Sequence, residues 1–269
     1  MNVAEARRAG LGVLLVVTVA AAGGCGVADA VKDAGAPASA KPLAPRDALL
    51  ESLPDASTGS FRFTITGGEA PTAGEIDAGR QSYRVGFRYR EPEAGFTLLS
   101  DFLVVKKQSW IKIRFTDAEG LTGLPKLPKK WMLIDPAKVK SDDVPVAYDN
   151  ETDPGEAGAV LRAIVDVKQT GAGHFAGTTD LTRKGESDIV DDARLKALGE
   201  RAKAVPFEAT VDGQGRLTSA VVKIPAAGKA KATRYVITYA GYGSTPTPAV
   251  PPADEQLPAT RDAYKLLNA

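Results

Sequence analysis

The sequence is poor in the residue types that build most metal and redox sites. Its 269 residues include one cysteine, Cys25, and one histidine, His174. A single cysteine excludes an internal disulfide framework and a thiolate zinc site, and a single histidine excludes a multi-histidine metal centre. We therefore expect neither a metal nor a cofactor.

The net charge of the chain is also close to zero. The chain has 34 Lys+Arg against 33 Asp+Glu, for a formal charge of +1. So close a balance provides no global field to attract a polyanion, and we expect no nucleic-acid partner. The remaining composition, 43% hydrophobic and 25% charged, is that of a globular chain that can build a core.

Residues 1–24 have the organisation of an export signal. Arg7 and Arg8 precede an apolar run over 11–22, which is short for a membrane span but suits a signal-peptide core. The run ends in small residues directly before Cys25, and this junction resembles a bacterial lipobox, whose cysteine becomes the lipidated first residue of the mature protein. We predict a lipoprotein signal peptide over 1–24 and lipid attachment at Cys25; a plain secretory signal is the alternative.

This prediction has consequences for location and organisation. A lipidated Cys25 would hold the protein at the cell membrane, on its extracytoplasmic face. Residues 25–45 are rich in Ala, Pro, Gly and Ser without apolar periodicity, which is typical of a flexible tether with a span of roughly 25 Å. We expect the folded, monomeric domain over 46–269.

Alternating apolar and polar residues predict most of that domain as strands. Phe61, Phe63 and Ile65, for example, alternate with arginine and threonine, which is the period of a strand with one buried face. The same pattern between turn residues predicts strands over 61–65, 74–78, 83–89, 98–106, 108–115, 131–134, 173–182, 205–211, 217–224 and 233–239.

Helical spacing predicts fewer and shorter segments. The dipeptides Asp135-Pro136 and Asp153-Pro154 combine a capping residue with proline at the first helical position. Apolar residues behind the second dipeptide repeat at helical intervals. Helices are expected over 46–53, 137–140, 157–168, 191–203 and 258–267.

The fold class follows from these elements. Each predicted strand has one polar and one apolar face, and a sheet of this size cannot leave its apolar face in water. We therefore expect an α+β fold, in which one curved antiparallel β-sheet forms a half-barrel and the helices cover its concave apolar face.

Several segments resemble actinobacterial cell-envelope lipoproteins of the LppX/LprG type, which have a LolA-like fold. The similarity covers roughly residues 46–258 and is carried by four segments in order: Trp-Met-Leu-Ile-Asp-Pro from Trp131, Gly-His-Phe-Ala-Gly-Thr-Thr-Asp-Leu from Gly173, Asp-Gly-Gln-Gly-Arg from Asp212, and Gly-Ser-Thr-Pro from Gly243 with the later Pro-Pro-Ala-Asp-Glu. Phe175 stands where the family has tyrosine. The resemblance implies a half-barrel around a hydrophobic cavity and the carriage of lipids or acylated glycolipids across the cell envelope.

The sequence has few residues or motifs that would indicate catalysis. His174 is the only imidazole, and on an alternating strand we expect it to be structural rather than a general base. No nucleophile elbow and no phosphate-binding loop occurs. We expect the protein not to be an enzyme.

Ligand binding finds more support, because many apolar side chains share one sheet face by parity. Ordinary core is the alternative for most of them, since the sequence does not distinguish a filled core from a hollow one. The candidate cavity residues are Phe61, Phe63, Ile65, Tyr83, Val85, Phe87, Ile111, Ile113, Phe115 and Trp131. On the opposite face lie basic residues, expected to be solvated or in contact with anionic headgroups: Arg84, Arg88, Arg90, Lys112 and Arg114.

Two functions remain open at this point. The first is a membrane-anchored lipoprotein that binds or transports a lipid or other hydrophobic ligand in the envelope. The alternative is an envelope protein-interaction or sensing module on the same fold without lipid cargo, as in RseB-like regulators.

Overall fold

The computed structural model describes residues 43–268, except residues 69 and 184–188. The predicted signal peptide, the lipid attachment site Cys25 and most of the tether lie outside the described residues. The described part is an α+β fold with one 12-stranded, mostly antiparallel sheet that is open, together with a few short helices.

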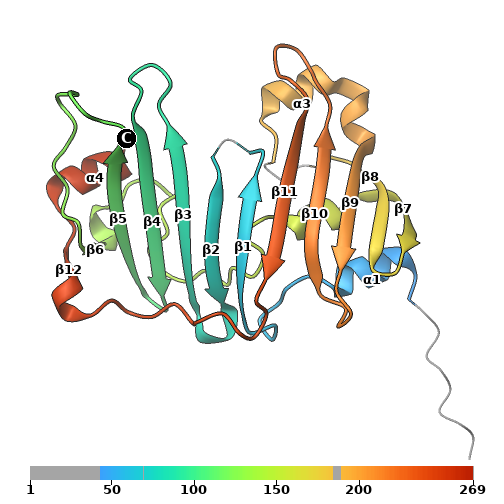
Figure 1. Ribbon diagram of the computed structural model, residues 1–269, viewed down its shortest axis with the longest axis horizontal. Coiled ribbons are helices and arrows are strands. Elements are labelled where there is room, and N and C mark those ends of the chain that lie inside the picture. Colours follow the sequence, from blue (N-terminus) through green and yellow to red (C-terminus); the bar gives the residue numbers. More distant parts are fainter. Residues whose placement is uncertain (1–42, 69, 184–188, 269) are drawn as a thin grey trace, which may run out of the picture. The chain divides into compact units, whose positions relative to one another are not determined.

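The sheet is assembled from two series of sequential strands (Figure 1). The strands are β1 (Ser60–Thr66), β2 (Thr72–Asp77), β3 (Ser82–Arg90), β4 (Thr97–Val105), β5 (Gln108–Thr116), β6 (Trp131–Leu133), β7 (Ile164–Gly171), β8 (His174–Thr179), β9 (Val205–Val211), β10 (Leu217–Ile224), β11 (Thr233–Ala240) and β12 (Gln256–Pro258). Their spatial order is β12-β6-β5-β4-β3-β2-β1-β11-β10-β9-β8-β7. The pairing of β1 with β11 joins the two series, and among the strands of the described residues only β12 and β6 pair in parallel.

Turn chemistry explains the hairpins. Between β9 and β10, the Asp212 carboxylate accepts hydrogen bonds from the backbone N–H groups of Gln214 (2.9 Å) and Arg216 (3.0 Å). Gly215 takes a positive φ of 81° in this turn, which glycine adopts without steric cost. The aspartate and glycine of this short segment thus determine where the chain reverses.

The strand register gives the whole sheet one apolar face, which we call the inner face. Directly paired residues share a face, and the pairing places Phe63, Val85, Phe102, Ile111 and Met132 in the same rows of that face. The alternate residues form the outer face. The period-2 pattern of the sequence therefore carries from β1 to β6.

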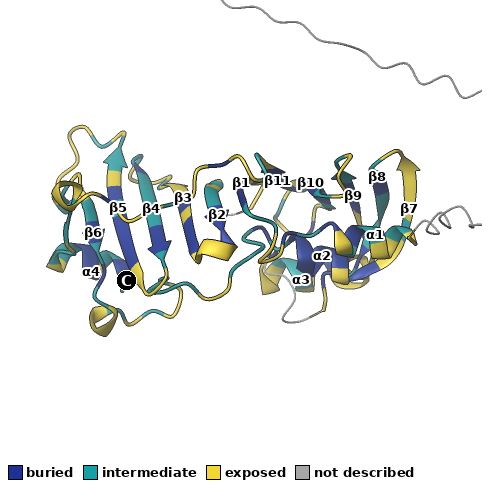
Figure 2. Ribbon diagram, turned by 90° about the horizontal axis from the view of Figure 1, so that it is seen from below, coloured by how far each residue is buried: buried dark blue, intermediate teal, exposed yellow. Residues whose placement is uncertain are grey.

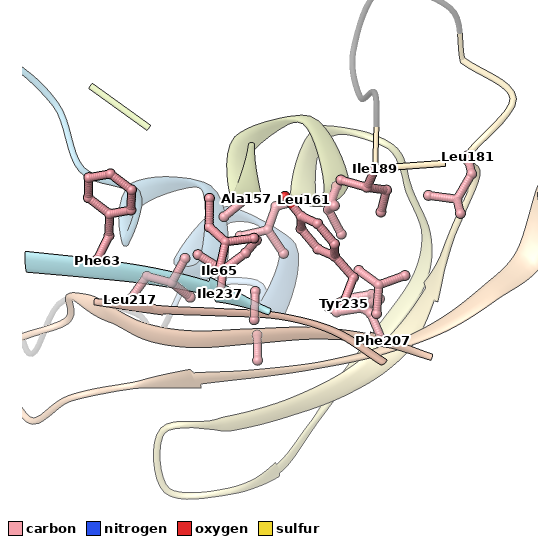
Figure 3. Packing of buried hydrophobic residues seen from close by; sticks show 14 of the residues in the cluster. Phe63, Ile65, Ala157, Leu161, Leu181, Ile189, Phe207, Leu217, Tyr235 and Ile237 are labelled. Carbon is pink, nitrogen blue, oxygen red and sulfur yellow. The ribbon is translucent and has the colours of Figure 1, made fainter. Parts of the chain in front are cut away.

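Short helices cover the inner face at two places. Helices α1 (Pro45–Glu51), α2 (Ala157–Arg162) and α3 (Asp192–Leu198) gather beside the half of the sheet that contains β7 to β11 (Figure 2). Figure 3 shows how Ala157 and Leu161 of α2 meet Ile65 and Ile237 of the sheet. Helix α4 (Arg261–Leu267) packs Ala263, among others, against β5 and β6.

The ten expected strands are confirmed with shifts of at most three residues at an end, while β7 and β12 were not predicted. One helix prediction was wrong in extent: α2 ends at Arg162, and the residues from Ile164 onward form β7 instead of continuing to 168. Apolar residues there fit both periods, and pairing with β8 decides between them, because Ile164 lies opposite Thr179.

The other expected helices are also shorter than predicted: α1 ends at Glu51 instead of 53, and α4 begins at Arg261 instead of 258. Residues 137–140 form only a short 3-10 turn (Pro136–Lys138), and the segment 191–203 divides into α3 and a 3-10 helix (Gly199–Ala204). The divide falls at Gly199, which has a positive φ of 56°. A positive φ lies outside the helical region of the backbone, so the α-helix ends here.

Candidate functional site

The inner face carries two apolar clusters, and Phe102 packs against both of them. The larger one packs beneath α1, α2 and α3 and includes Phe61, Phe63 and Ile237. The smaller one packs beneath α4 and includes Ile111 and Met132. Because the helices gather at two places, the middle strands β2 to β4 are left without a helix above them.

An apolar cleft of about 310 Å³ lies over these middle strands. This volume is at the lower end of the range for small-molecule sites. Its floor consists of hydrophobic side chains from β1 to β4, namely Phe63, Ile65, Ile76, Tyr83, Val85, Phe87 and Phe102. Most of them are buried, but Phe87 is 40% exposed. Phe87 therefore presents an aromatic ring at the opening of an otherwise buried apolar surface.

Residues 140–154 form the wall of the cleft, and we call them the wall segment. One end is held by Asn268, whose side-chain oxygen accepts from the Lys140 N–H (2.8 Å). The middle is held by the backbone bond from Tyr148 N–H to the Lys106 carbonyl (2.7 Å). The wall is thus attached to the end of α4 and to the β4–β5 hairpin, both distant in sequence.

The other end of the wall segment is held by Asp153. Its carboxylate accepts from the Gly158 N–H inside the first turn of α2 (2.5 Å) and from the Tyr239 hydroxyl of β11. Tyr239 is 2% exposed. Asp153 therefore joins the wall, the helix and the sheet through one side chain.

The wall brings four carboxylates to the cleft: Asp142, Asp143, Asp149 and Glu151. The first three are exposed, and Glu151 is half-buried. Burial raises the pKa of Glu151, and the charges of Asp153 and Asp149 raise it further, whereas a hydrogen bond from the Asp153 N–H (2.5 Å) acts in the opposite direction. An apolar floor and an acidic wall thus face the same space.

Aromatic contacts shape the floor and connect it to the wall. The rings of Phe87 and Phe102 meet edge to face, with centroids 6.3 Å apart. Tyr83 contacts Tyr148 of the wall, with centroids 6.1 Å apart. Burial raises the pKa of Tyr148 to about 12, so both tyrosines are neutral at physiological pH. The aromatic surface of the cleft is uncharged.

Five of the ten predicted cavity residues line this cleft: Phe63, Ile65, Tyr83, Val85 and Phe87. They come from two strands, β1 and β3, which β2 separates. Gly74 of β2 makes room between them, because a Cβ atom at this position would lie 2.8 Å from the Phe63 ring.

The other five predicted residues lie elsewhere. Phe61 is fully buried and packs against Tyr239 and Tyr242, and Ile111 and Ile113 are buried in the cluster beneath α4. Phe115 is partly buried at the far end of β5, beside Phe96. The fifth residue, Trp131, belongs to the outer face.

On that outer face, Trp131 lies near cations. The Lys112 ammonium is 4.7 Å from the Trp131 ring centroid and the Arg84 guanidinium is 5.9 Å from it. Asp101 accepts from Arg84 (3.2 Å) and from Arg114 (3.1 Å). Three of the predicted basic residues are thus engaged in outer-face contacts.

Sequence reasoning did not identify Ile76, Phe102 or the carboxylates of the wall as site residues. Phe102 and Ile76 pair with residues of β3, so their parity was a usable signal. The wall had no such signal, because its place depends on contacts with Lys106, Asn268 and Tyr239.

The remaining chemistry of the described residues is sparse. His174 is exposed at the start of β8, and the Asp180 carboxylate accepts from Thr182 (2.6 Å). Within the described residues, no group of three or more His, Cys, Asp or Glu is placed to hold a metal ion. In the same part of the chain, no helix has the length and apolarity needed to cross a membrane.

No protein-family model matches the chain, and no curated protein matches it.

Proposed function

We propose that this protein is a membrane-anchored lipoprotein that binds or transports a lipid or other hydrophobic ligand in the cell envelope. The observation that supports this function is the apolar cleft on the inner face, floored by side chains of β1 to β4 and open at Phe87. Apolar surface in such a concave position is favourable to cover, at roughly 25 cal/mol per Å².

The proposal assigns the chain to the LppX/LprG-type lipoproteins. In this interpretation the open sheet corresponds to a LolA-like half-barrel, the inner face to its concave face, and the cleft to its ligand site. Lipidation of Cys25 would tether the domain to the extracytoplasmic face of the membrane through residues 26–45. The tether would let the cleft approach the membrane without a transmembrane helix.

The test begins with the ligand itself. The full chain is purified from membranes, extracted with organic solvent and analysed by mass spectrometry, and the intact protein is examined by native mass spectrometry. A co-purifying lipid at near-stoichiometric amount is the expected result. Absence of any lipid from repeated preparations, together with capture of an envelope protein by cross-linking, would favour the sensing module instead.

A pair of variants locates the binding. Phe87→Ala removes the exposed ring of the cleft and should weaken binding of the neutral probe N-phenyl-1-naphthylamine about fivefold, as expected for about 1 kcal/mol of lost apolar contact. Tyr89→Ala is the matched control, because Tyr89 is on the same strand, is 47% exposed and does not line the cleft. Equal effects of the two variants would contradict binding in the cleft.

A further inference from the structure

The acidic wall of the cleft indicates which ligands it favours. Four carboxylates line the cleft, and its lining contains no lysine, arginine or histidine. None of the four takes part in an ion pair between described residues. The charged side chains that line the cleft are therefore all acidic.

The basic side chains of the same strands do not line the cleft, so they do not pair with these carboxylates. Arg84 and Arg88 alternate along β3 with Tyr83 and Phe87, so they project from the outer face while the aromatic rings face the cleft. Arg84 also pairs with the outer-face carboxylate of Asp101 at 3.2 Å. The sheet thus separates a basic outer face from an acidic cleft.

Aromatic rings complete a site suited to a cation. Phe87 is 40% exposed and meets Phe102 with ring centroids 6.3 Å apart, and both rings line the same cleft as the four carboxylates. Aromatic faces together with carboxylates attract an ammonium group by cation–π and charge interactions. An anionic head at the same position would be repelled by all four carboxylates.

We infer that the cleft, as the ligand site of the proposed function, selects amphiphiles with a cationic head, such as an alkylammonium group, over anionic ones. The tail lies on the apolar floor of β1 to β4, and the head lies between Phe87 and the acidic wall. This inference rests on the proposed function, but it makes a separate claim about the charge of the ligand.

The experiment compares three amphiphiles with the same ten-carbon tail: decyltrimethylammonium, decyl maltoside and decyl sulfate. Each competes with N-phenyl-1-naphthylamine for the full chain carrying Cys25→Ala, below its micelle concentration and at low salt. Decyltrimethylammonium should bind about tenfold more tightly than decyl sulfate, the combined effect of several exposed charge pairs, each weak by itself. Added salt should reduce the difference.

Charge-matched variants test the origin of that preference. A triple variant removes three exposed wall carboxylates: Asp142→Asn, Asp143→Asn and Asp149→Asn. It keeps Glu151, whose carboxylate accepts a hydrogen bond from the Asp153 N–H. The control triple variant changes three exposed acids that do not line the cleft: Glu93→Gln, Glu119→Gln and Asp254→Asn. Both alter the net charge equally. The preference should fall below twofold in the first variant and persist in the control.

Equal binding of all three amphiphiles, or an equal loss of preference in both triple variants, would overturn the inference. If Phe87→Ala still weakens binding in that case, the proposed function survives without the charge selectivity. If no amphiphile binds, or Phe87→Ala has no effect on any of them, the proposed function fails as well.

Discussion

Replacing Asp153 with alanine removes the side chain that joins the wall segment, α2 and β11. Two hydrogen bonds are lost, one from the Gly158 N–H (2.5 Å) and one from the Tyr239 hydroxyl. Loss of an acceptor in the first helical turn costs about 1 kcal/mol. Leaving a buried hydroxyl without its acceptor costs a further ~1–3 kcal/mol, because Tyr239 is only 2% exposed.

We therefore expect Asp153→Ala to lower the free energy of unfolding by about 2–4 kcal/mol. For a domain of this size, the melting temperature should fall by about 4–16 °C. Urea unfolding followed by circular dichroism measures the change. The midpoint should shift without a change in slope, since the fold itself is retained.

A double-mutant cycle separates the two bonds. Tyr239→Phe alone removes the buried hydroxyl and should cost about 1 kcal/mol. In that background Asp153→Ala leaves no buried hydroxyl unpaired, so the second change should cost at least ~0.5 kcal/mol less than in the parent chain. Additivity of the two changes, or an Asp153→Ala variant as stable as the parent, would refute the role assigned to this side chain.

A glycine of β2, a buried tyrosine and the predicted lipidation site give three more predictions. Gly74→Ala should destabilise the sheet by about 1–3 kcal/mol, because its Cβ would lie 2.1 Å from the Arg84 carbonyl oxygen. Gly86→Ala should cost less, because its Cβ would lie 3.0 Å from the Asp101 carboxylate and 3.6 Å from the Ala73 carbonyl oxygen; urea unfolding compares the two variants. Burial raises the pKa of Tyr239 well above its usual range, so above pH 10 this hydroxyl loses its proton in the unfolded chain but keeps it in the folded one. The free energy of unfolding should therefore fall by about 1.4 kcal/mol per pH unit from this group, and Tyr239→Phe should reduce that fall. Cys25→Ala should move the protein from the membrane to the released fraction on cell fractionation; retention at the membrane would argue against the lipid anchor.

Much of the sheet could be predicted because alternation is a local property. Arg62 and Phe63 point to opposite faces whatever lies around them, since successive side chains of a strand always do. The helical middle was harder, because residues 164–168 fit both a helix and a strand. Pairing of Ile164 with Thr179 decided that case, and such a partner is not visible in the local sequence.

The candidate site divides in the same way. Parity alone placed Phe63, Val85 and Phe87 on one face, and they do line the cleft. Parity also grouped Ile111 with them, although Ile111 lies beneath α4. Whether an apolar residue is covered depends on where a distant helix packs, which strand periodicity does not specify.

The sequence by itself determined most of the strands, the apolar face and the near balance of charge, because these depend on residue type and spacing along the chain. Tertiary structure alone decided that helices cover this face at two places with a cleft between them, and that acidic residues border the cleft. The wall segment reaches its position through bonds to Lys106, Asn268 and Tyr239. Contacts over such separations depend on how the elements pack in three dimensions, and that packing decides which charges a ligand would meet.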